Sequence, residues 1–312
     1  MACGRPEMPA VPPKGTGVSD HPPASAPLAR RGKPVPGLHL VATPIGAARD
    51  ITLRALDILA GADVLAAEDT RTLRHLMEIH GIPLQGRPLL AYHDHNGEAA
   101  RPRLLAELRA GKSVAYASEA GTPLIADPGF QLARAAIAER LPVLAAPGAS
   151  AVLCALTVSG LPSDRFLFAG FLPNRSAARQ QDLRRLAGTQ ATLIFYESPK
   201  RLAATLRDMA EVLGGGRQAA VCRELTKKFE EVTRDSLGGL ADIFAVRDVK
   251  GEIVVLVDRA VAEIIDDDTI DRTLLHALET LSVKDAAAEV AEKLGLARRD
   301  LYQRALELGK DE

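Results

Sequence analysis

The stretch that decides the fold runs from Ser118 to Gly129 and reads SEAGTPLIADPG. It follows an apolar run, Val114 to Ala117, that is typical of a short buried strand. Two prolines and two glycines stop that strand and stiffen the turn after it. The stretch therefore predicts a rigid loop at the carboxyl end of a strand, where α/β proteins bind ligands. The alternative is an ordinary connection between a strand and a helix.

Composition indicates a globular protein of two domains. The chain has 312 residues, of which 47% are apolar and 25% charged, and a domain holds about 100–200 residues. The net charge of −1 means that any surface for nucleic acid must be local. Cys3, Cys154 and Cys222 lie far apart without histidines at zinc spacing. We therefore expect no metal site. Cys154 and Cys222 lie in apolar runs and are expected to be buried free thiols, which fit a reducing cytoplasm.

Neither the N-terminal segment nor the longest uncharged run predicts a membrane segment. The first 36 residues are rich in proline and lack a sustained apolar core, which predicts a disordered leader instead of a signal peptide. Three prolines interrupt the uncharged run from Leu141 to Ser163. This run favours a strand, a loop and a buried helix over a membrane span. We expect a cytoplasmic protein.

Strand-like runs alternate with helical periodicity after Gly37. The first domain has expected strands at 38–43, 63–67, 89–92, 114–117 and 143–145, and the second at 166–171, 192–196, 218–222 and 252–257. This pattern predicts a mostly parallel sheet followed by a mixed one. The expected parts are a leader at 1–36, an N-terminal α/β domain at 37–161, a C-terminal α/β domain at 162–262 and a helical extension at 263–312.

Four loops follow strands of the first domain and carry the chemistry. They are Thr43–Gly46, Glu68–Arg71, Ser118–Gly129 and Pro147–Ser150. There is no GxxxxGK[ST] and no GxGxxG after a strand, which excludes a P-loop and an ordinary dinucleotide fold. The loops offer amides, hydroxyls and carboxylates but no lysine, so they suit a polyphosphate badly. They suit a cationic ligand with a ribose and a flat base, and the sulfonium of S-adenosylmethionine fits.

Five motifs resemble one known family over the chain from Gly37 onwards. They are ATPIG (42–46) with DITLRAL (50–56), EDTR (68–71), AGTPLI (120–125), FYESP (195–199) and RELTK (223–227). The chain resembles the 16S ribosomal RNA cytidine 2′-O-methyltransferases, the ribosomal small-subunit methyltransferase I family, of the tetrapyrrole-methylase-like class. The resemblance implies two α/β domains with a cofactor cleft between them and a C-terminal helical extension.

The resemblance also implies the cofactor, S-adenosylmethionine, and the residues that bind it. From the first domain these are Thr43, Pro44, Gly46, Ser118, Glu119, Ala120, Gly121, Thr122, Pro123, Leu124, Ile125, Pro147 and Gly148, and from the second Tyr196, Arg223 and Glu224.

A ribose 2′-hydroxyl would attack the methyl carbon in line, and a carboxylate could accept its proton. The candidates for this base are Asp69, Glu68 and Glu197, of which Asp69 is favoured. The alternative for Glu68 and Asp69 is an ion pair with Arg71 or a helix N-cap at Thr70.

Positive charge for RNA is expected in local segments, mostly of the second domain. The candidate RNA contacts are Arg71, Arg175, Arg179, Arg184, Arg185, Lys200, Arg201 and Lys227, although a solvated helix face explains any one of them equally well. The helices from Val283 to Leu308 have the form of a helix-turn-helix, with a packing bundle as the equal alternative. The implied partners are 16S rRNA within the small ribosomal subunit, at a cytidine of the decoding centre, and a second copy in a homodimer.

Two other functions stay open at this point. One is a methylase of small tetrapyrroles, because a fold does not fix a substrate. The other is a catalytically silent ribosome assembly factor. Glu119 and Ala149 support this alternative, because the family pattern has other residues at those positions.

Overall fold

The computed structural model describes residues 32–93, 96–126, 128–260, 267–294 and 296–308. Most of the predicted leader, 1–31, lies outside the described residues. Contacts divide the described chain into two units: one holds residues up to Cys154 together with Leu225–Lys228, and the other holds Ala155–Glu224 and the residues from Phe229 onwards. The sequence predicts no such return of a short segment to the first unit.

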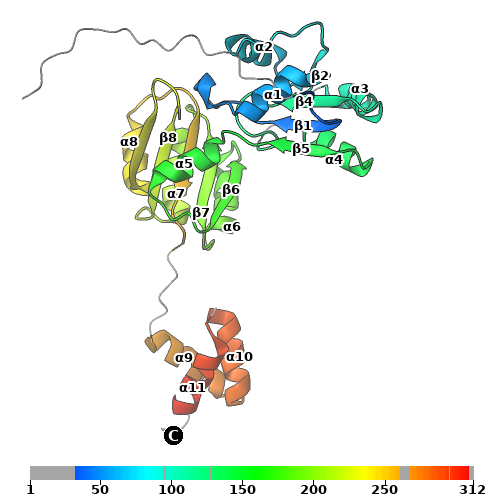
Figure 1. The fold of residues 1–312 in the computed structure, drawn as a ribbon. Coiled ribbons are helices and arrows are strands. Elements are labelled where there is room, and N and C mark those ends of the chain that lie inside the picture. The colour runs from blue at the N-terminus through cyan, green and yellow to red at the C-terminus, as the bar shows by residue number, and fades with distance from the viewer. Residues whose placement is uncertain (1–31, 94–95, 127, 261–266, 295, 309–312) are drawn as a thin grey trace, which may run out of the picture. The chain divides into compact units, whose positions relative to one another are not determined.

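The first unit is a parallel sheet covered by helices on both faces (Figure 1). Its strands lie in the order β3-β2-β4-β1-β5. In chain order its elements are β1 (Gly37–Val41), a 3₁₀ helix (Ala48–Asp50), α1 (Leu53–Gly61), β2 (Val64–Ala67), α2 (Thr70–Ile79), β3 (Leu89–Ala91), α3 (Gly97–Arg109), β4 (Ser113–Ala117), α4 (Phe130–Ala138) and β5 (Val143–Ala146), and α5 (Ala151–Ser159) begins in it.

The apolar faces of the helices pack on both sides of this sheet. The apolar residues of α1 and α2 share one core with one face of the sheet, and those of α3 and α4 share another with the opposite face. Every residue of β2 and β4 is buried, as expected for central parallel strands between two helix layers. Thr52 is the N-cap of α1, because its Oγ1 accepts a hydrogen bond from the amide of Ala55 at 3.2 Å.

The second unit holds a mixed sheet in the order β6-β7-β10-β8-β9. Its elements are β6 (Phe166–Phe171), α6 (Ser176–Leu186), β7 (Thr192–Glu197), α7 (Leu202–Leu213), β8 (Gln218–Arg223), β9 (Glu231–Ser236), α8 (Leu237–Ala245) and β10 (Ile253–Val257). Only the β6–β7 pair is parallel. The predicted mixed sheet is confirmed. The edge strand β9, with the sequence EVTRDS, is not among the predicted strands because it lacks an apolar alternation.

The last three helices have a core of their own. They are α9 (Asp267–Leu278), α10 (Val283–Leu294) and α11 (Arg298–Leu308). Their buried residues, among them Leu274, Val290 and Leu301, form one cluster. The predicted helical extension is therefore present. No helix in the described parts of the chain is long and apolar enough to cross a membrane.

Candidate functional site

The carboxyl edge of the first sheet contains a point where the chain reverses its direction of winding. The connection from β1 crosses β4 to reach β2 on one side, and the connection from β4 crosses β1 to reach β5 on the other. The helices that follow β1 and β4 cover opposite faces of the sheet, so the chain continues from these two neighbouring strands in opposite directions. Ligands of open α/β sheets bind at such a point.

Two hydrogen bonds join these loops as one extra rung beyond the strands. Thr43 N donates to Gly121 O at 2.9 Å, and Gly121 N donates to Thr43 O at 3.0 Å. The hydroxyl of Thr43 donates to Ser118 O at 3.2 Å, and the hydroxyl of Ser118 donates to Gly121 O at 2.5 Å. All three residues are buried. The predicted cofactor loops Thr43–Gly46 and Ser118–Ile125 are thus held together by the backbone.

The Ser118–Gly129 loop has the rigid, tightly turned backbone that its sequence predicts. Gly121 and Gly129 have φ values of +81° and +117°, and Leu124 also lies in the left-handed region, at +73°. A Cβ on Gly129 would lie 2.6 Å from the Tyr116 ring, so only glycine fits there. Unusual backbone of this kind is held by surrounding structure and is common at functional sites. Ile125 is 40% exposed at the loop's surface.

The Pro147–Ser150 loop, after β5, is joined to the same edge. Thr122 Oγ1 donates to Ala149 O at 2.9 Å, and Thr52 Oγ1 donates to Pro147 O at 3.2 Å. A Cβ on Gly148 would lie 2.8 Å from the Cβ of Ala42 at the end of β1. The absence of a side chain at Gly148 therefore lets the loop lie against β1. Three of the four predicted loops are brought together by these contacts.

The Gly46 turn is covered by the returning segment Leu225–Lys228. A Cβ on Gly46 would lie 2.5 Å from Lys227 Cγ and 2.6 Å from Thr226 Oγ1. Thr226 Oγ1 accepts a hydrogen bond from Ala47 N at 3.1 Å. Thr226 has φ +64°, a conformation that β-branched residues rarely adopt. Sequence reasoning did not select Thr226 as a site residue, because only the chain's return brings it to this turn.

The fourth loop, Glu68–Arg71, follows β2 beside β4. Asp69 is the N-cap of α2: its Oδ1 accepts from Arg71 N at 2.7 Å, and its Oδ2 accepts from Arg71 Nη2 at 3.1 Å. These hydrogen bonds to Arg71 lower the pKa of Asp69. Glu68 is half-buried, and among the described residues its carboxylate has no hydrogen bond or ion pair. Of the two neighbouring carboxylates, that of Asp69 is therefore occupied by Arg71, whereas that of Glu68 can accept a hydrogen bond or a proton.

Glu197, the third candidate base, is buried in the second unit. Its Oε2 accepts from Thr205 Oγ1 at 2.6 Å, its Oε1 accepts from Ser198 N at 2.7 Å, and Arg201 Nε lies 3.3 Å from Oε1. Only 1% of its side chain is exposed. Glu197 therefore ties the end of β7 to the start of α7, a structural role that does not leave it open to a substrate.

The remaining predicted cofactor residues lie at the carboxyl ends of β7 and β8. Tyr196 is half-buried, and burial raises the pKa of its hydroxyl. Arg223 donates through Nε and Nη2 to Glu231 Oε2 at 3.1 and 3.0 Å. Glu224 has φ +51° and accepts a hydrogen bond from the amide of Glu252 at 2.9 Å. Their contact with the cofactor stays a prediction.

The predicted RNA-binding cations differ in burial and in their partners. Arg179 is buried and bound to Asp208 at 2.6 Å, which removes it from the predicted set of RNA contacts. Four other predicted cations have a hydrogen-bond or ion-pair partner. The pairs are Arg71 with Asp69, Arg184 with Gln180, Arg185 with Asp182, and Arg201 with Glu197 and Asn174. Arg175 and Lys200 are exposed and have no such partner within the described parts of the chain. Lys227 lies in the segment over the Gly46 turn.

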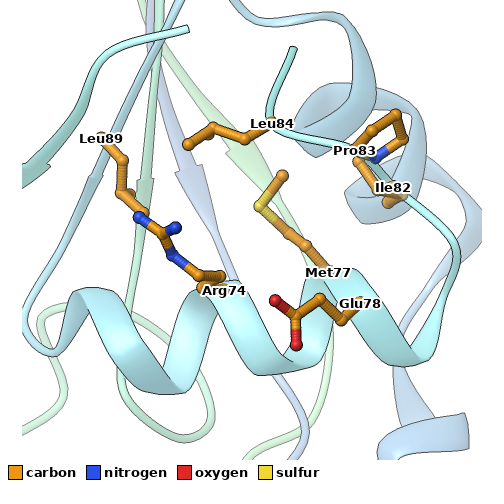
Figure 2. Close-up of a pocket in the computed structure, with 7 residues that line it drawn as sticks. All are labelled: Arg74, Met77, Glu78, Ile82, Pro83, Leu84 and Leu89. Atoms are coloured by element: carbon orange, nitrogen blue, oxygen red, sulfur yellow. The ribbon is translucent and has the colours of Figure 1, made fainter. Parts of the chain in front are cut away.

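A partly open hollow of about 180 Å³ lies elsewhere in the first unit. Figure 2 shows its lining by the later half of α2 and by the chain leading to β3, with Arg74 and Glu78 beside the apolar side chains of Met77 and Leu84. This hollow is on the side of the strands' amino ends and is smaller than the 300–1,000 Å³ or so of a usual cofactor pocket. The hollow is therefore a poor candidate for the cofactor site, and the edge of the loops stays the predicted one. The described residues contain no cluster of His, Cys, Asp and Glu placed to hold a metal ion.

Comparison with known proteins gives the family. Residues 37–241 match the model of the tetrapyrrole (corrin/porphyrin) methylases, and residues 263–309 match that of the RsmI C-terminal HTH domain. The ribosomal RNA small subunit methyltransferase I of Mesorhizobium japonicum is 52% identical over 88% of this chain and 92% of its own length. The chain belongs to the ribosomal RNA small subunit methyltransferase I family. The protein of that name from Xylella fastidiosa is 45% identical over 85% of this chain and 97% of its own.

Solved structures place this family member in a wider fold class. A cobalt-precorrin-4 methyltransferase of cobalamin biosynthesis has a TM-score of 0.55 and 17% identity, and covers 71% of this chain and 94% of its own. The uroporphyrin-III C-methyltransferase of Thermus thermophilus, solved with S-adenosylhomocysteine, has a TM-score of 0.50 and 19% identity, and covers 70% and 96%. The predicted tetrapyrrole-methylase fold is confirmed.

Proposed function

We propose that this protein transfers the methyl group of S-adenosylmethionine to the ribose 2′-hydroxyl of a cytidine in 16S rRNA, within the small ribosomal subunit. The observation that carries the proposal is the family membership: relatives named for rRNA methylation match at 40–52% identity over most of the chain. The tetrapyrrole enzymes match at 21% or less and share the fold alone. The cytidine, its 2′-oxygen and the decoding centre rest on the resemblance of the motifs. A homodimer is part of the same proposal.

The residues at the edge of the first sheet fit S-adenosylmethionine. Thr43, Ser118 and Gly121 hold the loops after β1 and β4 in place, and Gly121 and Gly148 place no side chain between the loops. The loops contain no lysine, and Glu119 adds an exposed carboxylate. This chemistry favours a cationic ligand with polar groups over a polyphosphate. When bound, the cofactor supplies an activated methyl group on a positively charged sulfur.

We assign the role of proton acceptor to Glu68. The sequence favours Asp69, but that carboxylate caps α2 and binds Arg71, which lowers its pKa and weakens it as a base. Glu197 is buried and fully engaged. Glu68 follows β2 directly, one strand from Ser118, and is uncommitted among the described residues.

Methyl transfer to purified small subunits tests the function. The subunits come from a strain that lacks the enzyme, and the methyl group of the cofactor carries tritium. We expect label in 16S rRNA that stays in a dinucleotide after alkaline hydrolysis, because a 2′-O-methyl group blocks attack on the neighbouring phosphate. Label in mononucleotides would place the methyl group on a base and contradict the 2′-oxygen. Binding of subunits without any label would contradict catalysis and favour an assembly factor.

A further inference from the structure

Two of the predicted RNA-binding cations, Arg175 and Lys200, follow neighbouring strands of the second unit, one of which ends in an exposed aromatic side chain. Phe171, the last residue of β6, is 57% exposed, although most phenylalanines of a folded chain are buried. Arg175 follows it at the start of α6, and Lys200 follows the neighbouring strand β7. Because β6 and β7 are parallel, both loops leave the sheet at the same edge. An exposed ring and two exposed cations therefore share one edge.

We infer that this edge is a nucleotide-binding surface, where one unstacked base of the substrate RNA stacks on Phe171 while Arg175 and Lys200 contact the phosphates beside it. The inference rests on the proposed function and names a contact surface for its RNA substrate. An aromatic face accepts any base, and cations beside it bind the backbone, which is how proteins hold single-stranded nucleotides.

The ring of Phe171 is held in position by its neighbours. It pairs in register with Tyr196 on β7, with ring centroids 5.6 Å apart and planes at 63°. Tyr196 in turn contacts Phe168, at 4.8 Å and 64°. Edge-to-face contacts of this kind orient a ring while leaving its outer face open. A base can therefore stack on Phe171 without first ordering it.

The loop between Phe171 and Arg175 is held by two arginines that the sequence assigned to RNA. Arg201 donates to Asn174 Oδ1 at 2.5 Å and to Leu172 O at 2.7 Å. Arg179 donates to Asn174 O at 3.2 Å from its buried position beside Asp208. These bonds fix the loop that carries Arg175 and join it to the start of α7, next to Lys200. Arg179 and Arg201 are thus positioning residues for the surface.

The charges around this edge fit a phosphate backbone. The nearby acids are already engaged: Glu197 is buried with Arg201 and Thr205, and Asp182 is paired with Arg185. Exposed Glu252 precedes β10, on the side of β7 away from β6, and bounds the surface there. The two loops that carry Arg175 and Lys200, residues 172–175 and 198–201, contain no carboxylate that would compete with phosphates for these cations.

Phe171→Ala in the full-length protein tests the stacking contact, with Phe166→Ala as its matched control. Phe166 lies at the other end of β6 and is 43% exposed, so both changes remove an exposed ring from one strand. Binding to small subunits is measured by co-sedimentation with S-adenosylhomocysteine present. We expect Phe171→Ala to weaken binding roughly 5- to 100-fold, with unchanged calorimetric affinity for S-adenosylhomocysteine. Phe171→Tyr should bind as the native protein does.

The charged contacts are tested by the salt dependence of the same binding. Arg175→Ala and Lys200→Ala should each reduce the slope of log affinity against log salt by about 1. Arg184→Ala is the control, because Arg184 lies on α6 but is hydrogen-bonded to Gln180, and it should leave the slope nearly unchanged.

Three results would overturn the inference while leaving the proposed function intact. The first is equal binding by Phe171→Ala and Phe166→Ala. The second is a smaller mass in sedimentation for Phe171→Ala, which would make the edge a contact between two copies of the chain. The third is a salt slope that neither cation changes. A native protein that neither binds nor methylates subunits would instead contradict the proposed function itself.

Discussion

Glu68 and Asp69 are adjacent carboxylates at the end of β2 with different surroundings. Asp69 caps a helix and binds Arg71, whereas Glu68 has no partner among the described residues. The difference comes from the direction of each side chain as the chain leaves the strand, so the sequence motif alone ranks them poorly. Two substitutions separate their roles.

Glu68→Gln should lower kcat by about 10²- to 10⁴-fold, because the amide cannot accept the proton of the ribose hydroxyl. Calorimetric affinity for S-adenosylhomocysteine should not change. Asp69→Asn serves as the control, since asparagine is also a good N-cap, and should leave kcat close to that of the native protein. A large loss of kcat in Asp69→Asn with full activity in Glu68→Gln would reverse the assignment.

Asp208→Ala should lower the free energy of unfolding by about 3–5 kcal/mol, because it leaves a buried arginine without its partner. The carboxylate accepts from Arg179 Nε at 2.6 Å and from Ser176 Oγ at 3.0 Å. Urea denaturation measures the loss. The double change Asp208→Leu with Arg179→Met should recover most of it, since it removes both charges. A loss below about 1 kcal/mol in the single variant would show that the pair is not desolvated.

At the scale of elements, Glu231 joins the β8–β9 hairpin to the chain after α8. It accepts hydrogen bonds from Arg247 at 2.6 and 2.7 Å and from Arg223 at 3.0 Å. Bonding to Arg247 first, and to Arg223 as well, lowers the pKa of Glu231 from 4.5 to about 2. A carboxylate with a lowered pKa stabilises the fold above its unfolded pKa and loses that contribution as the pH falls through the folded value.

The stability difference between the native protein and Glu231→Gln should therefore depend on pH. We expect the difference to be largest above about pH 4.5 and to shrink as the pH falls towards 2. Urea unfolding at several pH values, followed by circular dichroism, measures both proteins. A difference that stays constant over this range would mean that Glu231 does not titrate with the fold.

Gly46→Ala should weaken the affinity for S-adenosylhomocysteine, because a methyl group at Gly46 would displace Thr226 and Lys227 and with them the turn after Thr43. Calorimetry measures the affinity. Gly188→Ala is the control, since nothing lies within 4 Å of an added Cβ there. Unchanged affinity in Gly46→Ala would show that the turn moves without consequence for the cofactor.

At the scale of the whole molecule, the sequence predicts features that follow from the alternation of strands and helices along the chain. It does not predict features that depend on contacts between distant segments. The loops after β1, β4 and β5 could be placed at one edge because parallel strands end together. The role of Arg179 could not be predicted from the sequence, because its burial depends on Asp208, 29 residues later. Phe171 is one apolar residue in an apolar strand, and only the fold shows that it is exposed at the end of the strand where the loops with Arg175 and Lys200 begin.

The brief return of Leu225–Lys228 to the first unit has a consequence for dividing the protein. Neither unit is one continuous piece of chain, so a fragment ending at Cys154 would lack the cover of its own Gly46 turn. A chimera that takes its C-terminal half from a relative would also replace the segment Leu225–Lys228, which covers the Gly46 turn. Substitutions in the two segments therefore depend on each other: a change near Thr226 must be compatible with a turn about 180 residues earlier in the chain.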